Sequence, residues 1–273
     1  MKISREKARS LGFETVKILN VGYYVTNAGT RVDIQAHVDS SIRGTVSYPP
    51  ERDLPDHTSH DFKMTVDVRN QTTLGAVADM KELGFNPAAL NFASATSPGG
   101  GFLSGARAQE EYLARSSSLW LCLRNNPMYA YHQGRKNPFY SDYVIYSPNV
   151  LILRSDDGQL LERPYTCSII TSPAVHAKAV HRYMLERVEE IPDVMWNRIL
   201  KVLAVTEHHG HKGIVLGAWG CGAFGNDGKV IAGLFRKALA HNFSGAFEKV
   251  VFAITDWSEE KRFIGPFFDA FGN

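Results

Sequence analysis

The chain has 273 residues, 44% of them hydrophobic and 21% charged, which is the composition of a globular protein whose core folds without disulfides. A net charge of +2 is too balanced to favour binding of duplex nucleic acid, although it does not repel a polyanionic substrate. The three cysteines form no CxxC pair, which argues against a disulfide framework or zinc knuckle and predicts a reducing, cytoplasmic location.

The first 60 residues are predicted to form an extension that packs on the main body of the protein and carries no clear chemistry. Residues 5–19 have loosely periodic apolar positions that predict a helix, whereas residues 23–47 look extended and mixed. Residues 48–55 form a proline-rich connector that cannot be helical. The charged start of the chain has no apolar segment typical of a signal peptide, and no apolar run reaches the length of a membrane span.

From residue 62 onward, predicted strands and helices alternate, and residues 61–273 are predicted to form the catalytic domain. The predicted strands are 63–70, 88–93, 166–171, 213–219 and 249–255, and the predicted helices are 72–83, 109–123, 182–208 with a break near Pro192, and 230–242. Because most of these strands are continuously apolar, we expect an α/β/α sandwich with a mostly parallel sheet.

The first candidate site follows strand 88–93, where Pro98-Gly99-Gly100-Gly101 precedes Gln109-Glu110-Glu111. Strand, glycine loop and helix in this order place a phosphate at the carboxyl end of a strand, with loop N–H groups directed at its oxygens. The alternative is a flexible surface turn, which three glycines alone would support equally well. Phe102 directly after the glycines and the acidic pair beyond them favour a ligand site.

A second glycine-rich loop, residues 216–227, follows a buried strand and precedes a helix. Its Phe224 could present a ring face to a sugar or base, and the alternative is a turn with a core phenylalanine. Two such loops at two strand ends of one sheet are explained by a single ligand that bridges them, and a diphosphate fits this description.

Glu110 and Glu111 are neighbours on a helix and therefore do not face the same way. They cannot be the two opposed carboxyl groups of an ordinary glycosidase, which lie roughly 5–9.5 Å apart across the glycosidic bond. We therefore expect one of them to transfer a proton and the other to orient the ligand. A helix N-terminus lowers a carboxyl pKa, whereas a bound diphosphate and a second glutamate raise it. We therefore expect the acid form to depend on bound substrate.

Other reactive side chains give weaker signals. The tract His208-His209-Gly210-His211 resembles a metal-binding sequence, but a solvated loop is expected at a helix end, and we predict no metal. Cys221 has no nearby residue that could act as a base for its thiol, so we expect it to be a small packing residue. The tyrosines between Tyr129 and Tyr146 either rim a nucleotide pocket or cover the core, and a cover is favoured.

These motifs resemble the signature of poly(ADP-ribose) glycohydrolases of the bacterial type, which have a macrodomain fold. The resemblance runs from about Val66 to the C-terminus and rests on the segments Asn91–Ser94, Pro98–Phe102, Gly105–Glu111, Ser147–Val150, Leu216–Asn226 and Val251–Ala253. It implies a three-layer α/β/α macrodomain with a mixed, mostly parallel sheet and an N-terminal extension.

The resemblance also implies roles for individual residues. Glu111 would be the general acid and base, and Glu110 would orient the terminal ribose. Asn91 would take the place of an asparagine that contacts the ribose in larger members of the family, although Ser94 lies nearer the glycines. The implied substrate-binding residues are Asn91, Gly99, Gly100, Gly101, Phe102, Gln109, Gly220, Cys221, Gly222, Ala223, Phe224 and Gly225, with Phe224 positioning the ribose.

The implied activity is hydrolysis of ribose–ribose glycosidic bonds in poly(ADP-ribose) on modified proteins, which releases ADP-ribose in the DNA damage response. It needs no metal or cofactor, and we expect a cytoplasmic monomer without membrane or duplex nucleic-acid contacts. The alternatives are a mono-ADP-ribosyl hydrolase and a non-catalytic ADP-ribose-binding macrodomain, although simple binding macrodomains lack the Gln-Glu-Glu motif.

Overall fold

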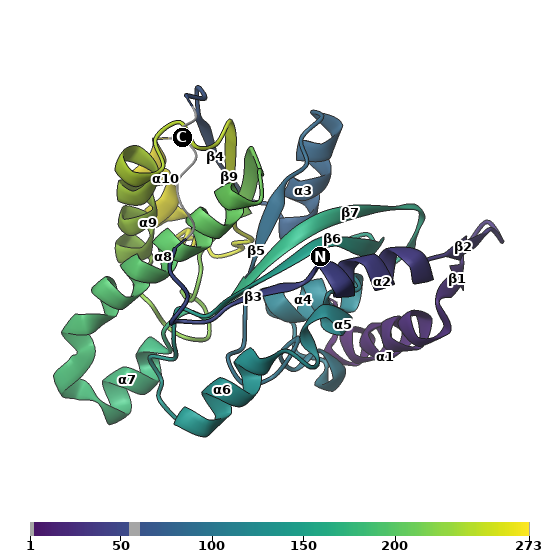
Figure 1. Ribbon diagram of the computed structural model, residues 1–273, viewed down its shortest axis with the longest axis horizontal. Coiled ribbons are helices and arrows are strands. Elements are labelled where there is room, and N and C mark those ends of the chain that lie inside the picture. The colour runs from purple at the N-terminus through teal and green to yellow at the C-terminus, as the bar shows by residue number, and fades with distance from the viewer. Residues whose placement is uncertain (1–2, 55–60, 273) are drawn as a thin grey trace.

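A seven-stranded sheet forms the centre of the molecule in the computed structural model, which describes residues 3–54 and 61–272 (Figure 1). The strand order is β3-β6-β7-β5-β8-β9-β4, and β1 and β2 form a separate two-stranded ribbon. The strands are β1 (Tyr23–Val25), β2 (Arg31–Asp33), β3 (Val46–Tyr48), β4 (Thr65–Arg69), β5 (Ala88–Phe92), β6 (Val144–Arg154), β7 (Leu160–Ser172), β8 (Gly213–Leu216) and β9 (Lys249–Ala253). The five strands from β7 to β4 are parallel, and β6 and β3 complete the sheet in antiparallel pairings, so the predicted mostly parallel sheet is confirmed.

Helices cover both faces of this sheet (Figure 1). They are α1 (Arg5–Val21), α2 (Gln35–Gly44), α3 (Thr73–Glu82), α4 (Gln109–Ser116), α5 (Leu119–Leu123), α6 (Pro127–Arg135), α7 (Ala177–Tyr183), α8 (Ile191–His208), α9 (Gly228–Lys237) and α10 (Gly265–Phe271), with shorter helical turns η1 (Phe102–Ser104), η2 (Leu185–Glu190) and η3 (Ala238–Asn242). The expected three-layer α/β/α architecture is confirmed.

Neighbouring residues of the central strands belong to different cores, which explains why the strands are apolar throughout. Leu90 and Ile214 pack with α8, α9 and α10, while Ala89 and Val215 pack with α3, α4 and α5. Side chains alternate between the faces of a strand, so a strand covered by helices on both sides needs apolar residues at every position. A third, smaller core lies between α1, α2, α5 and β6.

The prediction that residues 35–47 are extended is wrong, because Gln35–Gly44 forms α2. Val38 and Ser41, three positions apart, are its buried residues, and the Ser41 hydroxyl donates to the Pro148 carbonyl at 2.7 Å. Tertiary contacts therefore stabilise a helix whose local sequence signal is weak. β3 pairs with β6 inside the main sheet, and the domain boundary at residue 60 stays a prediction.

Two predicted helices are divided in the structure. Residues 109–123 form α4 and α5, because Ser117 is extended, bridges to Ile152 and donates its hydroxyl to the Leu113 carbonyl at 2.7 Å. Residues 182–208 form the end of α7, η2 and α8, and Pro192 lies in the first turn of α8, where proline is tolerated. The break predicted near Pro192 therefore coincides with the point where α8 begins.

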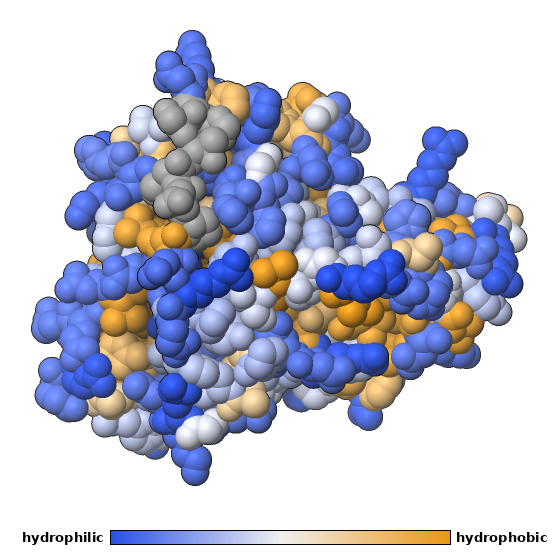
Figure 2. Space-filling view, viewed as in Figure 1, coloured by the Kyte–Doolittle hydropathy of each residue, from blue (hydrophilic) through white to orange (hydrophobic). Residues whose placement is uncertain are grey.

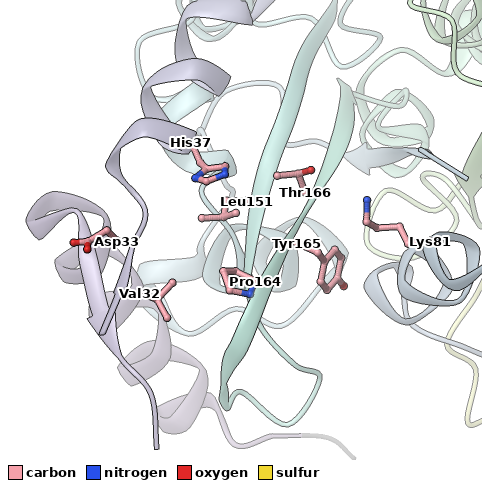
Figure 3. A pocket seen from close by; sticks show the side chains of 8 residues that line it. All are labelled: Val32, Asp33, His37, Lys81, Leu151, Pro164, Tyr165 and Thr166. Carbon is pink, nitrogen blue, oxygen red and sulfur yellow. The ribbon is translucent and has the colours of Figure 1, made fainter. Parts of the chain in front are cut away.

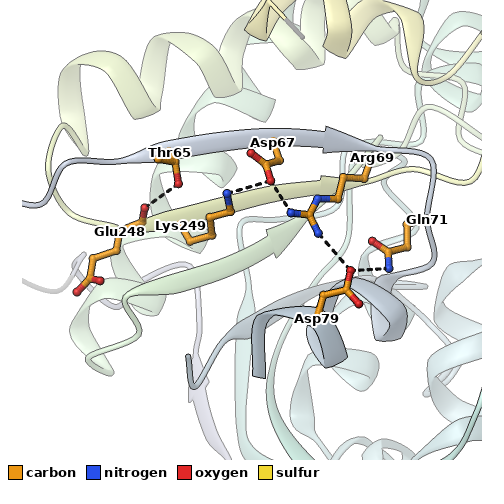
Figure 4. A network of polar contacts seen from close by, with 7 residues as sticks. All are labelled: Thr65, Asp67, Arg69, Gln71, Asp79, Glu248 and Lys249. Carbon is orange, nitrogen blue, oxygen red and sulfur yellow. Dashed lines mark hydrogen bonds and ion pairs between the residues drawn. The ribbon is translucent and has the colours of Figure 1, made fainter. Parts of the chain in front are cut away.

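Charged side chains cover the edge strand β4 (Figure 4). Asp67 accepts a hydrogen bond from Arg69 at 2.6 Å and pairs with Lys249 at 2.9 Å. Arg69 also reaches Asp79 on α3 at 3.2 Å. Such a network keeps an exposed strand edge from pairing with another chain.

The molecular surface is mostly hydrophilic on the face shown in Figure 2, where apolar side chains form several separate patches. Among the described residues, none of the helices combines the length and the apolar character needed to cross a bilayer.

Candidate active site

The first glycine loop folds around the two glutamates at the end of β5. Gly99 and Gly100 have φ values of +72° and +58°, which glycine adopts without strain. A Cβ atom added at Gly100 would lie 2.4 Å from Oε1 of Glu111 and 3.0 Å from Oε2 of Glu110. The absence of a side chain at Gly100 is therefore what lets the loop backbone approach both carboxyl groups.

Glu110 is buried, with 3% of its surface exposed. Its Oε2 accepts a hydrogen bond from the Ser94 amide at 2.6 Å, and its Oε1 accepts one from Asn91 Nδ2 at 3.5 Å. Burial raises the pKa of Glu110 to about 8, against the opposing effect of the Ser94 amide. The expected lowering by the helix N-terminus is therefore wrong for this residue, which carries its proton at neutral pH without substrate.

One carboxyl oxygen of Glu111 accepts a hydrogen bond, and the other has no partner among the described residues. Oε1 accepts a hydrogen bond from the Gly101 amide at 2.9 Å. Oε2 is shielded from solvent and has no hydrogen-bond partner among the described residues. A buried carboxyl oxygen without a partner is unfavourable by itself, so this atom is suited to exchange a proton with a bound ligand.

Three other predicted site residues, in the elements that flank this loop, face the protein interior. Gln109 accepts a hydrogen bond from the Phe92 amide at 2.9 Å and donates to the Leu90 carbonyl at 2.8 Å, which fixes α4 against β5. Phe102 is buried beside Trp120, and Asn91 is fully buried beside Glu110. Asn91 therefore supports the carboxyl group of Glu110 from the interior, whereas Gln109 and Phe102 pack the neighbouring elements together.

The second glycine loop follows β8 and is closed by Asn226. Asn226 Nδ2 donates to the carbonyl groups of Val175 and Gly220 at 2.7 and 3.1 Å. Within residues 3–54 and 61–272, the amides of residues 222–225 have no acceptor, and a Cβ atom at Gly222 would meet no atom within 4 Å. A row of free amides beside open space is suited to bind an anion.

Cys221 lies in the same loop but is buried in the hydrophobic core. Burial raises the pKa of its thiol to about 12, so the sulfur is unreactive at neutral pH. The expectation of a small packing residue is confirmed, whereas its predicted contribution to substrate binding stays a prediction. Ala223 is exposed at the outer part of the loop.

Phe224 belongs to a group of three rings, here called the ring cluster, together with His176 and Tyr140. The Phe224 ring stacks on His176 at a centroid distance of 4.6 Å and an angle of 15°, and it lies 6.1 Å from the ring of Tyr140. Tyr140 has a positive φ of 55°, which is uncommon for a residue other than glycine. His176 was not predicted as a site residue, although it follows a third parallel strand, β7, at the same edge of the sheet.

Some of the tyrosines between residues 129 and 146 cover the core, and one lies at the candidate site. Tyr129, Tyr143 and Tyr146 are buried and cover the core, as favoured from the sequence. Tyr140 is half-buried and lies next to Phe224. The tyrosine-rich segment therefore covers the core and also contributes one ring to the site.

The histidine tract does not form the expected solvated loop. His209 stacks on Tyr146 at a centroid distance of 3.5 Å, and His211 is hydrogen-bonded to the Tyr146 hydroxyl at 3.0 Å. Burial lowers the pKa of His209 to about 4, so its ring is neutral. The structured part of the chain contains no group of three or more His, Cys, Asp or Glu side chains placed to hold a metal ion. His57 and His60 lie outside the described residues.

A cavity of about 380 Å³, shown in Figure 3, is lined by no residue of either glycine loop. His37 of α2, Lys81 of α3 and Tyr165 and Thr166 of β7 line it, and none of the predicted site residues does. The strand ends, with their free amides and carboxyl groups, offer the more specific chemistry, so the candidate site is placed there.

Comparison with known proteins gives a consistent result. Residues 13–155 match the family model of the microbial-type poly(ADP-ribose) glycohydrolase catalytic domain, and a search of curated proteins found no match. The poly(ADP-ribose) glycohydrolase of Thermomonospora curvata is 44% identical over 98% of each chain with a TM-score of 0.90, and its complex with the inhibitor ADP-HPD has a TM-score of 0.87. The enzyme of Deinococcus radiodurans in complex with ADP-ribose is 37% identical over 88% of this chain and 98% of that chain, with a TM-score of 0.81.

Proposed function

Because the chain belongs to the microbial-type poly(ADP-ribose) glycohydrolase family, we propose that its two glycine loops bind the terminal ADP-ribose of the polymer and that Glu111 cleaves the adjoining bond. The chain is a hydrolase, a glycosidase that acts on poly(ADP-ribose). The observation that carries the proposal is the arrangement of Glu111, with Oε1 fixed by the Gly101 amide and Oε2 unpartnered.

Glu111 acts first as an acid and then as a base. Its carboxyl group gives a proton to the departing ribose hydroxyl oxygen as the bond from that oxygen to the anomeric carbon breaks. The anomeric centre then has oxocarbenium character, which the negative charge of the neighbouring diphosphate stabilises. The ionised Glu111 removes a proton from water, the remaining hydroxide adds to the anomeric carbon, and the acid is regenerated.

Glu110 orients the terminal ribose. Its raised pKa means that the carboxyl group is neutral at pH 7, so it can donate a hydrogen bond to a sugar hydroxyl while its oxygens accept from Ser94 and Asn91. A neutral neighbour also avoids repulsion when Glu111 becomes ionised during the reaction.

The second loop holds the diphosphate, and Phe224 holds the ribose. The free amides of residues 222–225 and the open space at Gly222 support this assignment for the phosphates. The stacking of Phe224 on His176 supports a fixed ring face beside the sugar.

The setting of the reaction is a further part of the proposal. We place the enzyme in the cytoplasm, as a monomer that acts on polymer attached to modified proteins in the DNA damage response. The three cysteines are free and buried, which fits a reducing compartment. Size-exclusion chromatography and fractionation of cells with and without DNA damage test these assignments, and a stable dimer or a secreted protein would contradict them.

The test compares polymer and singly modified protein as substrates for the wild type, Glu111→Gln and the control Glu82→Gln, which changes an exposed glutamate of α3. The wild type and the control should release ADP-ribose from polymer, and Glu111→Gln should be slower by about 10²–10⁴-fold, the usual contribution of a general acid. ADP-ribose should still bind to all three proteins.

The same experiment separates the alternatives. Release only from singly modified protein would identify a mono-ADP-ribosyl hydrolase, and tight binding without turnover of either substrate would identify a binding macrodomain. Full activity of Glu111→Gln would remove this residue from the mechanism.

A further inference from the structure

Arg198 is a buried cation on α8 whose hydrogen bonds end on two loops of the site. Only 1% of its surface is exposed, and burial lowers its pKa to about 10, so it remains charged at neutral pH. Within the described part of the chain, no carboxylate forms a direct ion pair with it, and its Nε has no hydrogen-bond partner. The carboxylate of Asp142, which pairs with Lys201 at 3.7 Å, attracts the Arg198 charge only at longer range. A buried charge without a direct ion pair is unfavourable, so the contacts that Arg198 does make need an explanation.

Both contacts of Arg198 are to backbone carbonyl groups. Nη1 donates to the carbonyl of Pro173 at 3.0 Å, and Nη2 donates to the carbonyl of Phe139. Pro173 begins the segment that follows β7, and Phe139 lies between α6 and β6. The planar guanidinium has donors in a fixed geometry, so it sets the distance between these two segments.

These two segments carry two members of the ring cluster. The carbonyl of Phe139 belongs to the same peptide plane as the amide of Tyr140, so Arg198 fixes the plane next to the strained backbone of Tyr140. The amide of His176 donates to the carbonyl of Pro138 at 2.9 Å, which joins the segments a second time.

The segment after β7 also positions the second glycine loop. Asn226 donates to the Val175 carbonyl, and a Cβ atom at Gly220 would lie 2.6 Å from the methyl group of Ala174. The His176 ring then stacks on Phe224. A continuous set of contacts therefore runs from Arg198 to the ring that faces the sugar.

We propose that Arg198 is a positioning residue for glycosidic cleavage, which acts through Tyr140 and His176 to hold the ring of Phe224 against the terminal ribose. This inference rests on the proposed role of Phe224. It extends the site to a residue of α8 that does not touch the substrate.

The test is a double-mutant cycle that combines Arg198→Lys with Phe224→Ala. Lysine keeps the positive charge, but its single ammonium group does not reproduce the planar fork that joins two carbonyl groups. In the wild-type background we expect kcat to fall roughly 10–100-fold, since small displacements of positioning groups have effects of this size. In the Phe224→Ala background the further loss should be less than about 2-fold, because the ring through which Arg198 acts is already gone.

Arg154→Lys is the matched control. Arg154 is also a buried arginine, and it donates to the Thr15 hydroxyl at 3.1 Å and to the Gly158 carbonyl at 2.8 Å, without contact to the ring cluster. We expect this variant to lower the melting temperature while kcat stays within about 2-fold of the wild type. If Arg198→Lys does not fold, Arg198→Gln, which keeps a planar donor group, takes its place in the cycle.

The possible outcomes separate this inference from the proposed function. An unchanged kcat for Arg198→Lys, or an equal loss of kcat in both backgrounds, would overturn the role of Arg198 alone. Normal turnover by Phe224→Ala would instead overturn the proposed role of Phe224, and the activity of Glu111→Gln tests the reaction itself.

Discussion

The two glycine loops differ in what their backbone amides do. In the first loop the amides of Ser94 and Gly101 donate to Glu110 and Glu111, so they are occupied inside the protein. In the second loop the amides of residues 222–225 have no acceptor among the described residues, and Asn226 helps to close the turn. Similar glycine-rich sequences at two strand ends therefore serve different purposes.

This difference shows that a glycine loop can be preorganised for catalysis or for binding. Amides already bonded to carboxyl groups fix the position of the reacting groups before substrate arrives. Free amides instead gain their hydrogen bonds only when an anion is bound. The first loop should thus be sensitive to any change in backbone shape, and the second loop should be sensitive chiefly to changes that fill the ligand space.

Among changes to the glycines of the two loops, the largest effect is expected for Gly100→Ala. The alanine Cβ would meet Oε1 of Glu111 at 2.4 Å, and φ at this position is +58°, a conformation that costs L-residues roughly 1–2 kcal/mol. We expect the displaced carboxyl groups to lower kcat by at least about 10²-fold. Steady-state kinetics on polymer, with circular dichroism to show that the variant is folded, checks this result, and near-normal turnover would show that the close approach is unimportant.

The second prediction concerns the buried carboxyl group of Glu110. Its folded pKa of about 8 lies above the ordinary value of 4.5, so the native state holds a proton that the unfolded state releases between these values. Protonation of Glu110 contributes its full amount to the free energy of unfolding below pH 4.5, and this contribution is lost as the pH rises through 8. Glu110→Gln cannot lose a proton, so its stability relative to the wild type should increase by roughly 2–4 kcal/mol between pH 5 and pH 9.

Urea unfolding of Glu110→Gln and the wild type across this pH range measures the difference. Glu82→Gln, which changes an exposed carboxylate of α3, should follow the wild type at every pH. Parallel curves for Glu110→Gln and the wild type would mean that Glu110 is ionised in the native protein.

The sequence predicted those features of the site that are local along the chain. Gly99–Gly101 and Glu110 lie within one loop and the helix that follows it, so their association needs no knowledge of the fold. The ring cluster could not be predicted, because Tyr140, His176 and Phe224 come together only when three segments meet at the sheet edge. The protonation of Glu110 was also missed, since it depends on burial beside Asn91 rather than on its position in the helix.

The same distinction applies to the fold. The central parallel strands were recognised because burial on both faces leaves continuous apolar runs. β6 was not predicted as a whole strand, because Pro148 and Asn149, which has a φ of +50°, interrupt it where its register with β7 shifts. α2 was missed because contacts such as that of Ser41 with Pro148 stabilise it.

A smaller effect is expected for Phe224→Ala in the second loop. Loss of the ring should lower kcat by about 10–100-fold, because the sugar is no longer held in a reactive orientation. The affinity for ADP-ribose should stay measurable, since the amides that hold the phosphates are unchanged. Kinetics and calorimetric titration check both statements, and a complete loss of binding with no folding defect would show that Phe224 holds the ligand as a whole.

The smallest effect is expected for Gly222→Ala, which is the counterpart of Gly100→Ala in the second loop. A Cβ atom at Gly222 meets no atom within 4 Å, so the free energy of unfolding should stay within about 0.5 kcal/mol of the wild type. The methyl group would occupy the space assigned to the diphosphate, and we expect ADP-ribose to bind about tenfold more weakly, equivalent to about 1.4 kcal/mol.

Gly233→Ala provides the matched control for Gly222→Ala, because Gly233 is also open to solvent but lies on the exposed side of α9. This control should bind ADP-ribose as the wild type does. Unchanged affinity in Gly222→Ala would place the diphosphate away from the free amides, whereas a loss of stability would show that the second loop is as tightly constrained as the first. Either result would remove the distinction between a loop organised for catalysis and a loop left open for an anion.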